Sequence, residues 1–320
     1  MGVTGRNTQE AKIPVVDFSK IINHTSSTTS SSSCWVEARA QVCQALEEYG
    51  CFVATLSDAD ADADEYNKIF GSLDELFGFP KEIKLQNTYD KPFRGYHSPN
   101  DVHEGLGIDD PTDPQAIHNF ANLFWPNGNH PNFSESADGY AKVVVRLDET
   151  VTRMIFEHYG VDNKWCESHI GATDYVLRLH KYDGAAAAGE EHMALPEHTD
   201  MNLTTIIHQN HVNGLEVKIA NGDWVPFDVS PNSFIFMTGD GFQVWSNDRI
   251  KPCVHRVMMS DKEVRYSVLL STFHSGTISV PEELIDDQHP LRYKPLNHLQ
   301  YLASQLGQNY RVCVNNFCGL

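Results

Sequence analysis

The 320-residue sequence has no long apolar run, no CxxC cysteine pair and no apolar core in its first residues. No stretch approaches the roughly 20 apolar residues that a membrane-spanning helix requires. The seven cysteines are scattered, odd in number and free of any CxxC pair, which predicts reduced thiols in an intracellular protein. The first residues, MGVTGRNTQEAKIP, contain no apolar core, so we expect no signal peptide and a cytoplasmic location.

The sequence is also poor in basic residues, with a net charge of −19. This charge argues against nucleic acid or an anionic membrane surface as a partner. It does not exclude an anionic substrate, because a buried arginine can set the local field. The apolar content of 41% and charged content of 21% are typical of a globular protein, and we expect a monomer.

The first half of the sequence predicts helices with two short strands. Apolar residues recur at helical spacing over 35–49 and 139–159, and a glycine follows each stretch as a helix end requires. Residues 13–18 and 51–54 are typical of short strands. Between them, the serine- and threonine-rich residues 25–33 predict a flexible loop.

The acidic stretch 57–65 alternates aspartate with alanine and precedes a helix that we expect to end near Phe77. Negative charge at a helix start is favourable, so a solvated helix N-terminus is the first interpretation. A calcium site is the alternative, although the glycine turn of an EF-hand is absent.

After Thr173 the pattern changes to many short strands separated by turn residues. Strands are predicted at 175–182, 203–208, 215–219, 234–237, 243–245, 253–258 and 264–273, and a final helix at 293–305. Strands at this spacing predict a mainly β fold with flanking helices around a double-stranded β-helix, or jelly roll. We expect one compact unit with a helix/strand region at 12–118, the core at 172–275 and a C-terminal part at 276–320.

One short motif, His198-Thr199-Asp200, stands out among the sixteen histidines. Side chains two apart on a strand lie on the same face of a sheet. With His255 from a distant strand, they would form a 2-His-1-carboxylate face that leaves coordination positions open, as in non-haem Fe(II) oxygenases. Other histidines compete for the role of ligand: His192, His208, His211 and His274.

A second motif follows His255. Arg265 and Ser267 are also two apart, so a guanidinium and a hydroxyl would lie side by side on one face. This pair is suited to one carboxylate, because the guanidinium fork binds both oxygens and the hydroxyl donates a further bond. A buried structural arginine is the alternative interpretation.

Together these motifs resemble a known family. The segments around His198-Thr199-Asp200, Trp245–Arg249, His255–Val257 and Arg265–Ser267 resemble the plant 2-oxoglutarate- and Fe(II)-dependent dioxygenases of the isopenicillin-N-synthase-like superfamily. The resemblance covers nearly the whole chain. Residues 119–126 and 214–217 are most similar to the branch with glucosinolate side-chain dioxygenases and a steroidal-alkaloid hydroxylase.

The resemblance implies roles for individual residues. His198, Asp200 and His255 would bind Fe(II), while Arg265, Ser267 and Tyr182 would hold 2-oxoglutarate. O₂ would be the oxidant, with ascorbate in support. No side-chain general base is implied, and hence no catalytic residue beyond these ligands. The sequence departs from the family two residues before Tyr182, where His180 replaces a common asparagine.

The implied activity is oxidation, first of all hydroxylation, of a small molecule of plant specialised metabolism, with release of succinate and CO₂. O-demethylation, desaturation and ring closure use the same cofactors. Aromatic residues are expected to line a site for a hydrophobic or ring-bearing substrate: Tyr96, Phe120, Phe124, Trp125 and Phe273. Residues 184–193 would form either a lid or a disordered linker.

Two rival functions stay open at this point. A zinc hydrolase could use the same two histidines and carboxylate, but it would not need the arginine and serine that suit a dicarboxylate. A non-catalytic binding protein could retain the fold.

Overall fold

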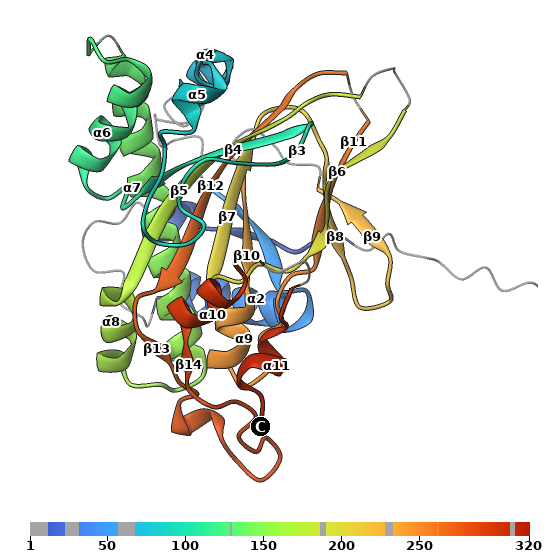
Figure 1. Ribbon diagram of the computed structural model, residues 1–320. Helices are drawn as coiled ribbons and strands as arrows, with labels where there is room; N and C mark the ends of the chain where they lie inside the picture. The colour runs from blue at the N-terminus through green and yellow to red at the C-terminus, as the bar shows by residue number, and fades with distance from the viewer. Residues whose placement is uncertain are drawn as a thin grey trace, which may run out of the picture.

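Two β-sheets form the centre of the computed structural model, a jelly-roll core with flanking helices (Figure 1). The structure describes residues 12–22, 32–56, 68–128, 130–185, 190–227, 233–260, 262–307 and 311–320. Within these residues, no helix combines the length and the apolar character needed to cross a membrane.

The larger sheet has eight strands, in the order β1-β2-β10-β7-β12-β5-β4-β3. Neighbours pair antiparallel, except for β1 and β2, which are parallel. The strands are β1 (Val15–Asp17), β2 (Cys51–Thr55), β3 (His97–Asn100), β4 (His103–Asp109), β5 (Thr173–Tyr182), β7 (Thr204–Gln209), β10 (Ser233–Thr238) and β12 (Arg265–His274).

The smaller sheet has four antiparallel strands in the order β6-β11-β8-β9. They are β6 (His192–His198), β8 (Leu215–Lys218), β9 (Trp224–Pro226) and β11 (His255–Met259). A separate two-stranded pair joins β13 (Thr277–Ile278) to β14 (Leu296–Asn297).

Helices flank the larger sheet, and α6, α7 and α8 lie on the side away from the smaller sheet (Figure 1). The α-helices are α1 (Ser19–Ile22), α2 (Ser33–Glu48), α4 (Leu73–Gly78), α5 (Lys81–Lys84), α6 (Pro114–Phe124), α7 (Pro131–His158), α8 (Asn163–Gly171), α9 (Asp240–Trp245), α10 (His298–Ser304) and α11 (Val314–Cys318). The described part of the chain also contains two 3₁₀ turns, η1 (Ile69–Ser72) and η2 (Glu282–Leu284).

The predicted helix at 35–49 is present as α2, and its ends follow from local chemistry. The Ser32 hydroxyl accepts from the Trp35 N–H, which caps an otherwise unpaired donor. At the other end Gly50 takes a left-handed backbone with φ of 70°, and β2 begins at the next residue.

Several predicted boundaries differ from the structure. Helix α7 begins at Pro131, eight residues before the predicted start, because Gly139 is tolerated inside it. The predicted strand at 243–245 is wrong, since these residues end helix α9. The predicted helix at 293–305 begins only at His298 and is followed by a further helix, α11. The stretches 25–31 and 57–65 lie outside the described residues, and Ser33 already belongs to α2.

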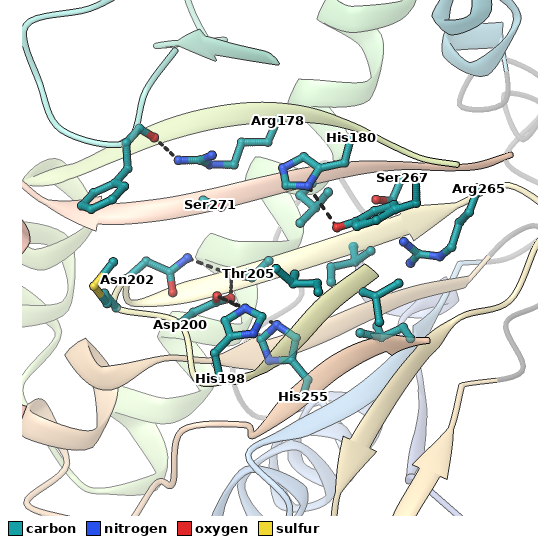
Figure 2. Close-up of a pocket in the computed structure, with 18 of the residues that line it drawn as sticks. Arg178, His180, His198, Asp200, Asn202, Thr205, His255, Arg265, Ser267 and Ser271 are labelled. Carbon is teal, nitrogen blue, oxygen red and sulfur yellow. Dashed lines mark hydrogen bonds and ion pairs between the residues drawn. The ribbon is translucent and has the colours of Figure 1, made fainter. Parts of the chain in front are cut away.

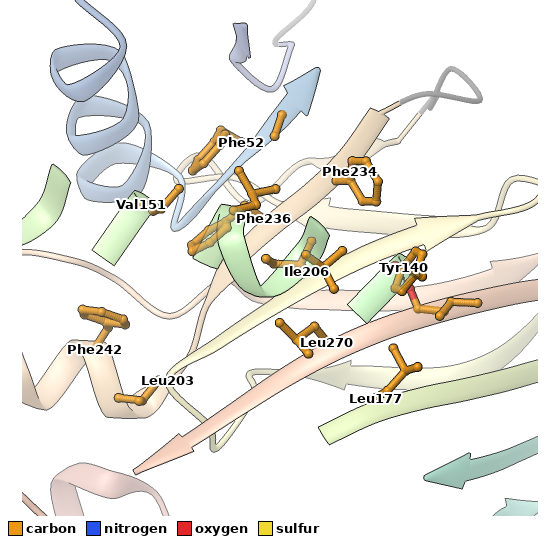
Figure 3. Close-up of a cluster of buried hydrophobic side chains, with 14 of the residues drawn as sticks. Phe52, Tyr140, Val151, Leu177, Leu203, Ile206, Phe234, Phe236, Phe242 and Leu270 are labelled. Atoms are coloured by element: carbon orange, nitrogen blue, oxygen red, sulfur yellow. Dashed lines mark hydrogen bonds between the residues drawn. The ribbon is translucent and has the colours of Figure 1, made fainter. Parts of the chain in front are cut away.

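The larger sheet has one face toward the helices and one toward the smaller sheet. On β5 and β12, Leu177, Leu179, Val268 and Leu270 belong to the main core, which also contains α7 residues such as Val151 (Figure 3). The Tyr140 hydroxyl of α7 donates to the Val268 carbonyl at 3.0 Å and so ties the helix to β12. The alternate residues of these strands point to the opposite face, where the site lies.

All seven cysteines are free thiols, as their scattered positions predicted. Burial raises the pKa of Cys43 to about 12, so this thiol stays protonated and packs as an apolar group.

Candidate active site

A cavity of about 150 Å³ lies between the two sheets and collects the polar side chains of their inner faces (Figure 2). The larger sheet contributes alternate residues of β5 and β12. The larger sheet also contributes Thr205 of β7, and the smaller sheet and the turn after β6 contribute the remaining polar residues. The polar groups that line the cavity are Arg178, His180, Tyr182, His198, Asp200, Asn202, Thr205, His255, Arg265, Ser267 and Ser271.

His198, Asp200 and His255 meet at one end of this cavity. His198 is the last residue of β6 and pairs directly with His255, the first residue of β11. Asp200 lies just beyond the strand, so the expectation that both motif residues sit on one strand is wrong. The three groups still converge, with the Asp200 Oδ1 atom 3.6 Å from His198 Nε2 and 4.0 Å from His255 Nε2.

Hydrogen bonds orient these three side chains. The Nδ1 atoms of His198 and His255 lie 2.8 Å and 3.1 Å from the carbonyl oxygens of Pro196 and Cys253. A proton on each Nδ1 leaves the Nε2 lone pairs facing Asp200.

The second carboxylate oxygen of Asp200 is also held. Oδ2 accepts from the Thr205 hydroxyl at 2.5 Å, and Asn202 in turn donates to that hydroxyl at 2.8 Å. The carboxylate is thereby fixed with Oδ1 free toward the two imidazoles.

The protonation states suit a divalent cation. Burial, and then the neighbouring His255, lowers the pKa of His198 to about 4, so its imidazole is neutral at neutral pH. For Asp200, burial alone would raise the pKa, but the charges of His255 and His198 outweigh it, and the pKa falls below its usual value. Two imidazoles and one carboxylate on one side of a point match the ligand set of non-haem Fe(II).

Arg265 lies in the same cavity, fully buried, at the start of β12. It donates to Gln209 Oε1 at 2.8 Å and stacks over the Tyr182 ring at 5.1 Å. Its Nε atom has no hydrogen-bond partner, and among the described residues no carboxylate forms an ion pair with it. Ser267 lies two residues further on the same face. The guanidinium and the hydroxyl together can therefore donate hydrogen bonds to one anion.

A second histidine cluster, of His97, His103 and His180, lies beside Tyr182 and also brings three ring nitrogens within 4.8 Å of one another. It contains no carboxylate. Burial lowers the pKa of His103 to about 4, and the positive charges of Arg265 and Arg178 add to that effect. The same charges would repel a dication, so this cluster fits iron less well than the first.

The histidine cluster instead supports Tyr182. The His103 ring stacks on the Tyr182 ring at 4.3 Å, and His180 Nδ1 lies 3.2 Å from the Tyr182 hydroxyl. His180 therefore replaces the common asparagine with a group that still contacts the tyrosine.

The four competing histidines lie outside the cavity lining. His208 faces the helices and packs against Phe70, and His211 contacts Glu263 on the surface. His192 begins β6, and the His274 ring accepts from the Gly276 N–H.

The five aromatic residues proposed for the substrate are divided by the structure. Phe273 lines the cavity. Phe120, Phe124 and Trp125 belong to α6 and its C-terminal end and pack into the main core, and Tyr96 donates to Glu104 at 2.6 Å. None of these four lines the cavity. For the three residues of α6 and its end the reason is that the helix lies on the far side of the larger sheet.

The segment 184–193 is described only in part. Residues 186–189 lie outside the described residues, while His192 and Met193 already pair with β11.

Sequence reasoning missed Arg178 and Thr205 as cavity residues. Arg178 could have been found, because it precedes His180 and Tyr182 at spacings of two on one strand. Thr205 carried no such signal, because its role depends on a turn that brings Asp200 back toward β7.

Two family models match the chain. The model of the 2OG-Fe(II) oxygenase superfamily matches residues 173–273, and that of the non-haem dioxygenase in morphine synthesis N-terminal region matches residues 13–127.

Curated relatives from Arabidopsis thaliana are similar over most of their length. A probable 2-oxoglutarate-dependent dioxygenase, AOP1.2, is 36% identical over 91% of this chain and 90% of its own length. The 2-oxoglutarate-dependent dioxygenase AOP3 is 28% identical over 90% of this chain and 94% of its own length.

Solved structures share the fold. A dioxygenase for auxin oxidation from rice has a TM-score of 0.76 and 24% identity, covering 97% of this chain and 100% of that one. JOX2 in complex with 2OG, Fe and JA has a TM-score of 0.70 and 20% identity, covering 91% and 84% of the two chains.

Proposed function

The chain belongs to the 2OG-Fe(II) oxygenase superfamily and is a 2-oxoglutarate-dependent dioxygenase, and from this premise we propose that it hydroxylates a hydrophobic or ring-bearing small molecule of plant specialised metabolism. We assign Fe(II) to His198, Asp200 and His255, and 2-oxoglutarate to Arg265, Ser267 and Tyr182. The proposed division of the chain is 12–118, 172–275 and 276–320.

One observation carries the assignment of the iron ligands. The Nε2 atoms of both histidines lie within 4.0 Å of Asp200 Oδ1. The other polar atom of each ligand, Nδ1 of the histidines and Oδ2 of Asp200, is hydrogen-bonded to the protein. Ligands that are already oriented lose little freedom when a metal binds.

The buried guanidinium supports the assignment of 2-oxoglutarate. Arg265 has an unpartnered Nε and no ion pair among the described residues, which is costly unless an anion binds there. A keto diacid suits the geometry, because one end can reach the metal while the distal carboxylate meets Arg265 and Ser267.

The protein's own groups bind, orient and exclude water. Bound Fe(II), 2-oxoglutarate and O₂ together supply the oxidation of a substrate C–H bond, with release of succinate and CO₂. Thr205 fixes the Asp200 carboxylate, and Gln209 and Tyr182 fix the Arg265 guanidinium. Apolar walls such as Leu195, Leu215 and Val257 shield the polar groups from bulk water.

A screen for substrate-stimulated succinate formation tests the proposal. Purified protein with Fe(II), 2-oxoglutarate and O₂ is incubated with plant metabolite fractions, and both succinate and the oxidised product are measured. We expect succinate to rise only when Fe(II) and an accepted substrate are both present, with one oxygen atom added to the product. Product mass separates hydroxylation from loss of a methyl group, desaturation and ring closure.

The zinc hydrolase is tested in the same samples. Activity with Zn²⁺ in place of Fe(II), without any need for 2-oxoglutarate, would overturn the proposal.

A further inference from the structure

Arg178 lies in the same cavity as the candidate iron ligands but away from Arg265 (Figure 2). On β5, Tyr182 pairs with Arg265 of β12, whereas Arg178 pairs with Leu269. These two levels are four residues apart, or about 13 Å along the strand. In Figure 2 the labelled His180 lies between the two guanidinium groups, and His198 and Asp200 lie below them on the opposite side of the cavity.

The Arg178 guanidinium has no acidic partner among the described residues. Its one hydrogen bond runs from Nη2 to the backbone carbonyl of Phe93. The carboxylates of Asp109 and Asp174 pair with Arg94 instead, each at 3.5 Å. A neutral carbonyl cannot balance a full positive charge.

This side chain is charged under working conditions. Burial, and then the positive charge of Arg94, lowers the pKa of Arg178 to about 10, while Asp200 acts in the opposite direction. At neutral pH the cavity therefore contains two protonated guanidiniums.

The sum of charges in the cavity shows which of the two guanidiniums has no negative partner once the proposed cofactors are bound. The ferrous ion adds two positive charges and Asp200 one negative charge. 2-Oxoglutarate adds two negative charges and Arg265 one positive charge, so these four groups cancel. Arg178 is then the one group in the cavity whose positive charge has no counterpart among them.

The cavity that Arg178 lines also has apolar walls. Phe93, Met201 and Phe273 are among its lining residues. Phe93 holds a left-handed backbone with φ of 58°, which a residue of this size rarely adopts, and its carbonyl meets the guanidinium. A charged fork is thus fixed at the edge of an apolar pocket.

We propose that Arg178 binds the carboxylate of the prime substrate, which is therefore a small monocarboxylic acid with a hydrophobic body. The inference rests on the proposed function, because the charge balance assumes bound Fe(II) and 2-oxoglutarate. The guanidinium fork takes both carboxylate oxygens, and the apolar walls take the rest of the molecule. An acid anchored there lies over the iron ligands, on the side away from Arg265.

Benzoate and benzamide are the probes for this site, because they differ in charge and hardly in shape. Each is titrated by calorimetry into anaerobic protein loaded with Fe(II) and saturating 2-oxoglutarate, so that the Arg265 site is already filled. We expect benzoate to bind the wild-type protein at least about tenfold more tightly than benzamide does.

Variants of Arg178 locate the binding. Arg178→Met should lower the affinity for benzoate by about tenfold to a hundredfold, and the affinity of Arg178→Lys should lie between those of Arg178→Met and the wild type. The exposed Arg146→Met on α7 is the matched control and should bind benzoate as the wild type does. Without ligand, Arg178→Met should melt at the wild-type temperature or above it, because an unbalanced charge is removed.

The outcomes distinguish failure of the carboxylate site from failure of the proposed dioxygenase function. Equal affinity for benzoate and benzamide, absence of binding by both, or unchanged benzoate affinity in Arg178→Met would each overturn the carboxylate site. 2-Oxoglutarate binding is followed by thermal stabilisation in the same samples. Failure of 2-oxoglutarate to stabilise the Fe(II)-loaded wild type would overturn the proposed function instead.

Discussion

Asp200 is the one carboxylate of the candidate metal site, and its two oxygens have different tasks. Oδ2 is fixed by Thr205, while Oδ1 faces His198 and His255. Removing the carboxylate leaves only the two imidazoles, which hold Fe(II) far less well.

We therefore expect Asp200→Ala to lose bound iron and to lower turnover by more than about a thousandfold, without unfolding the chain. Iron content, succinate formation and the melting temperature measure these effects. Glu197→Ala, which removes an exposed carboxylate next to the motif, should retain iron and activity. An Asp200→Ala protein that keeps its iron and turnover would exclude Asp200 as a ligand.

Arg265 is expected to act on 2-oxoglutarate and hardly on the prime substrate. Arg265→Ala should raise the KM for 2-oxoglutarate at least about tenfold, because a charge-assisted fork is lost, while the KM for the prime substrate changes little. Arg256→Ala removes an arginine of β11 that pairs with Glu216 instead, and should leave both constants near wild type. An equal rise of both constants in Arg265→Ala would argue against the assigned role.

At this scale the sequence predicted the residues whose neighbours are close in the chain. The spacing of two residues in His198/Asp200 and in Arg265/Ser267 predicts by itself that each pair lies on one face. Gln209 and the histidine cluster could not be predicted, because β4, β5, β7 and β12 become neighbours only through strand order. The aromatic residues of α6 were misplaced for the same reason, since aromatic character alone does not say which face of a sheet a helix covers.

At the scale of helices and strands, the connection from α2 to β2 leaves little room for a side chain. Gly50 has φ of 70°, and a Cβ there would lie 2.9 Å from the Cys253 backbone nitrogen. Cys253 in turn supplies the carbonyl that orients His255.

Gly50→Ala should lower the free energy of unfolding by about 2–5 kcal/mol, from backbone strain and overlap together. Gly160→Ala is the matched control: its φ is 72°, but a Cβ there would have no atom within 4 Å, so we expect a loss of only about 1–2 kcal/mol. Urea unfolding measures both, and equal losses would show that the overlap at Gly50 is relieved.

Helix α7 carries a buried acid against the sheet. Burial raises the pKa of Asp148 to about 7, with a smaller contribution from Glu149, against the hydrogen bond from Thr204. The folded state therefore binds this proton more tightly than the unfolded state does. Its contribution to stability is complete below the usual pKa of 3.8 and is lost as pH rises through about 7.

Asp148→Asn should remove this loss, which amounts to up to about 4 kcal/mol, and make the protein more stable than wild type above neutral pH. The free energy of unfolding, measured between acid and mildly alkaline pH, should fall less steeply for Asp148→Asn. The exposed Glu135→Gln, on the same helix, should follow the wild-type profile. Parallel profiles for wild type and Asp148→Asn would contradict the assigned protonation.

Element boundaries were predicted where a local stop exists and missed where it does not. Gly50 ends α2 because its left-handed backbone is a local property. Gly139, by contrast, lies inside α7, where tertiary packing of Tyr140 and its neighbours outweighs the weak helix propensity of glycine. Gln243–Trp245 was too short an apolar run to separate strand from helix.

At the scale of the whole molecule, one side of the sheets forms the apolar core and the other forms the cavity. The outer face of the larger sheet packs on helices and supplies the main core. Its inner face and the smaller sheet supply the polar cavity. The jelly-roll class followed from the run of short strands, whereas the meeting of β6 and β11, which brings His198 to His255, is a property of the folded chain.

An anaerobic crystal structure with Fe(II) and 2-oxoglutarate, with anomalous data at the iron edge, tests the central claim most directly. The expected result is one iron peak bound by His198 Nε2, Asp200 Oδ1 and His255 Nε2, with the distal carboxylate of 2-oxoglutarate on Arg265 and Ser267. An iron peak at His97, His103 and His180 instead, or 2-oxoglutarate bound away from Arg265, would contradict it.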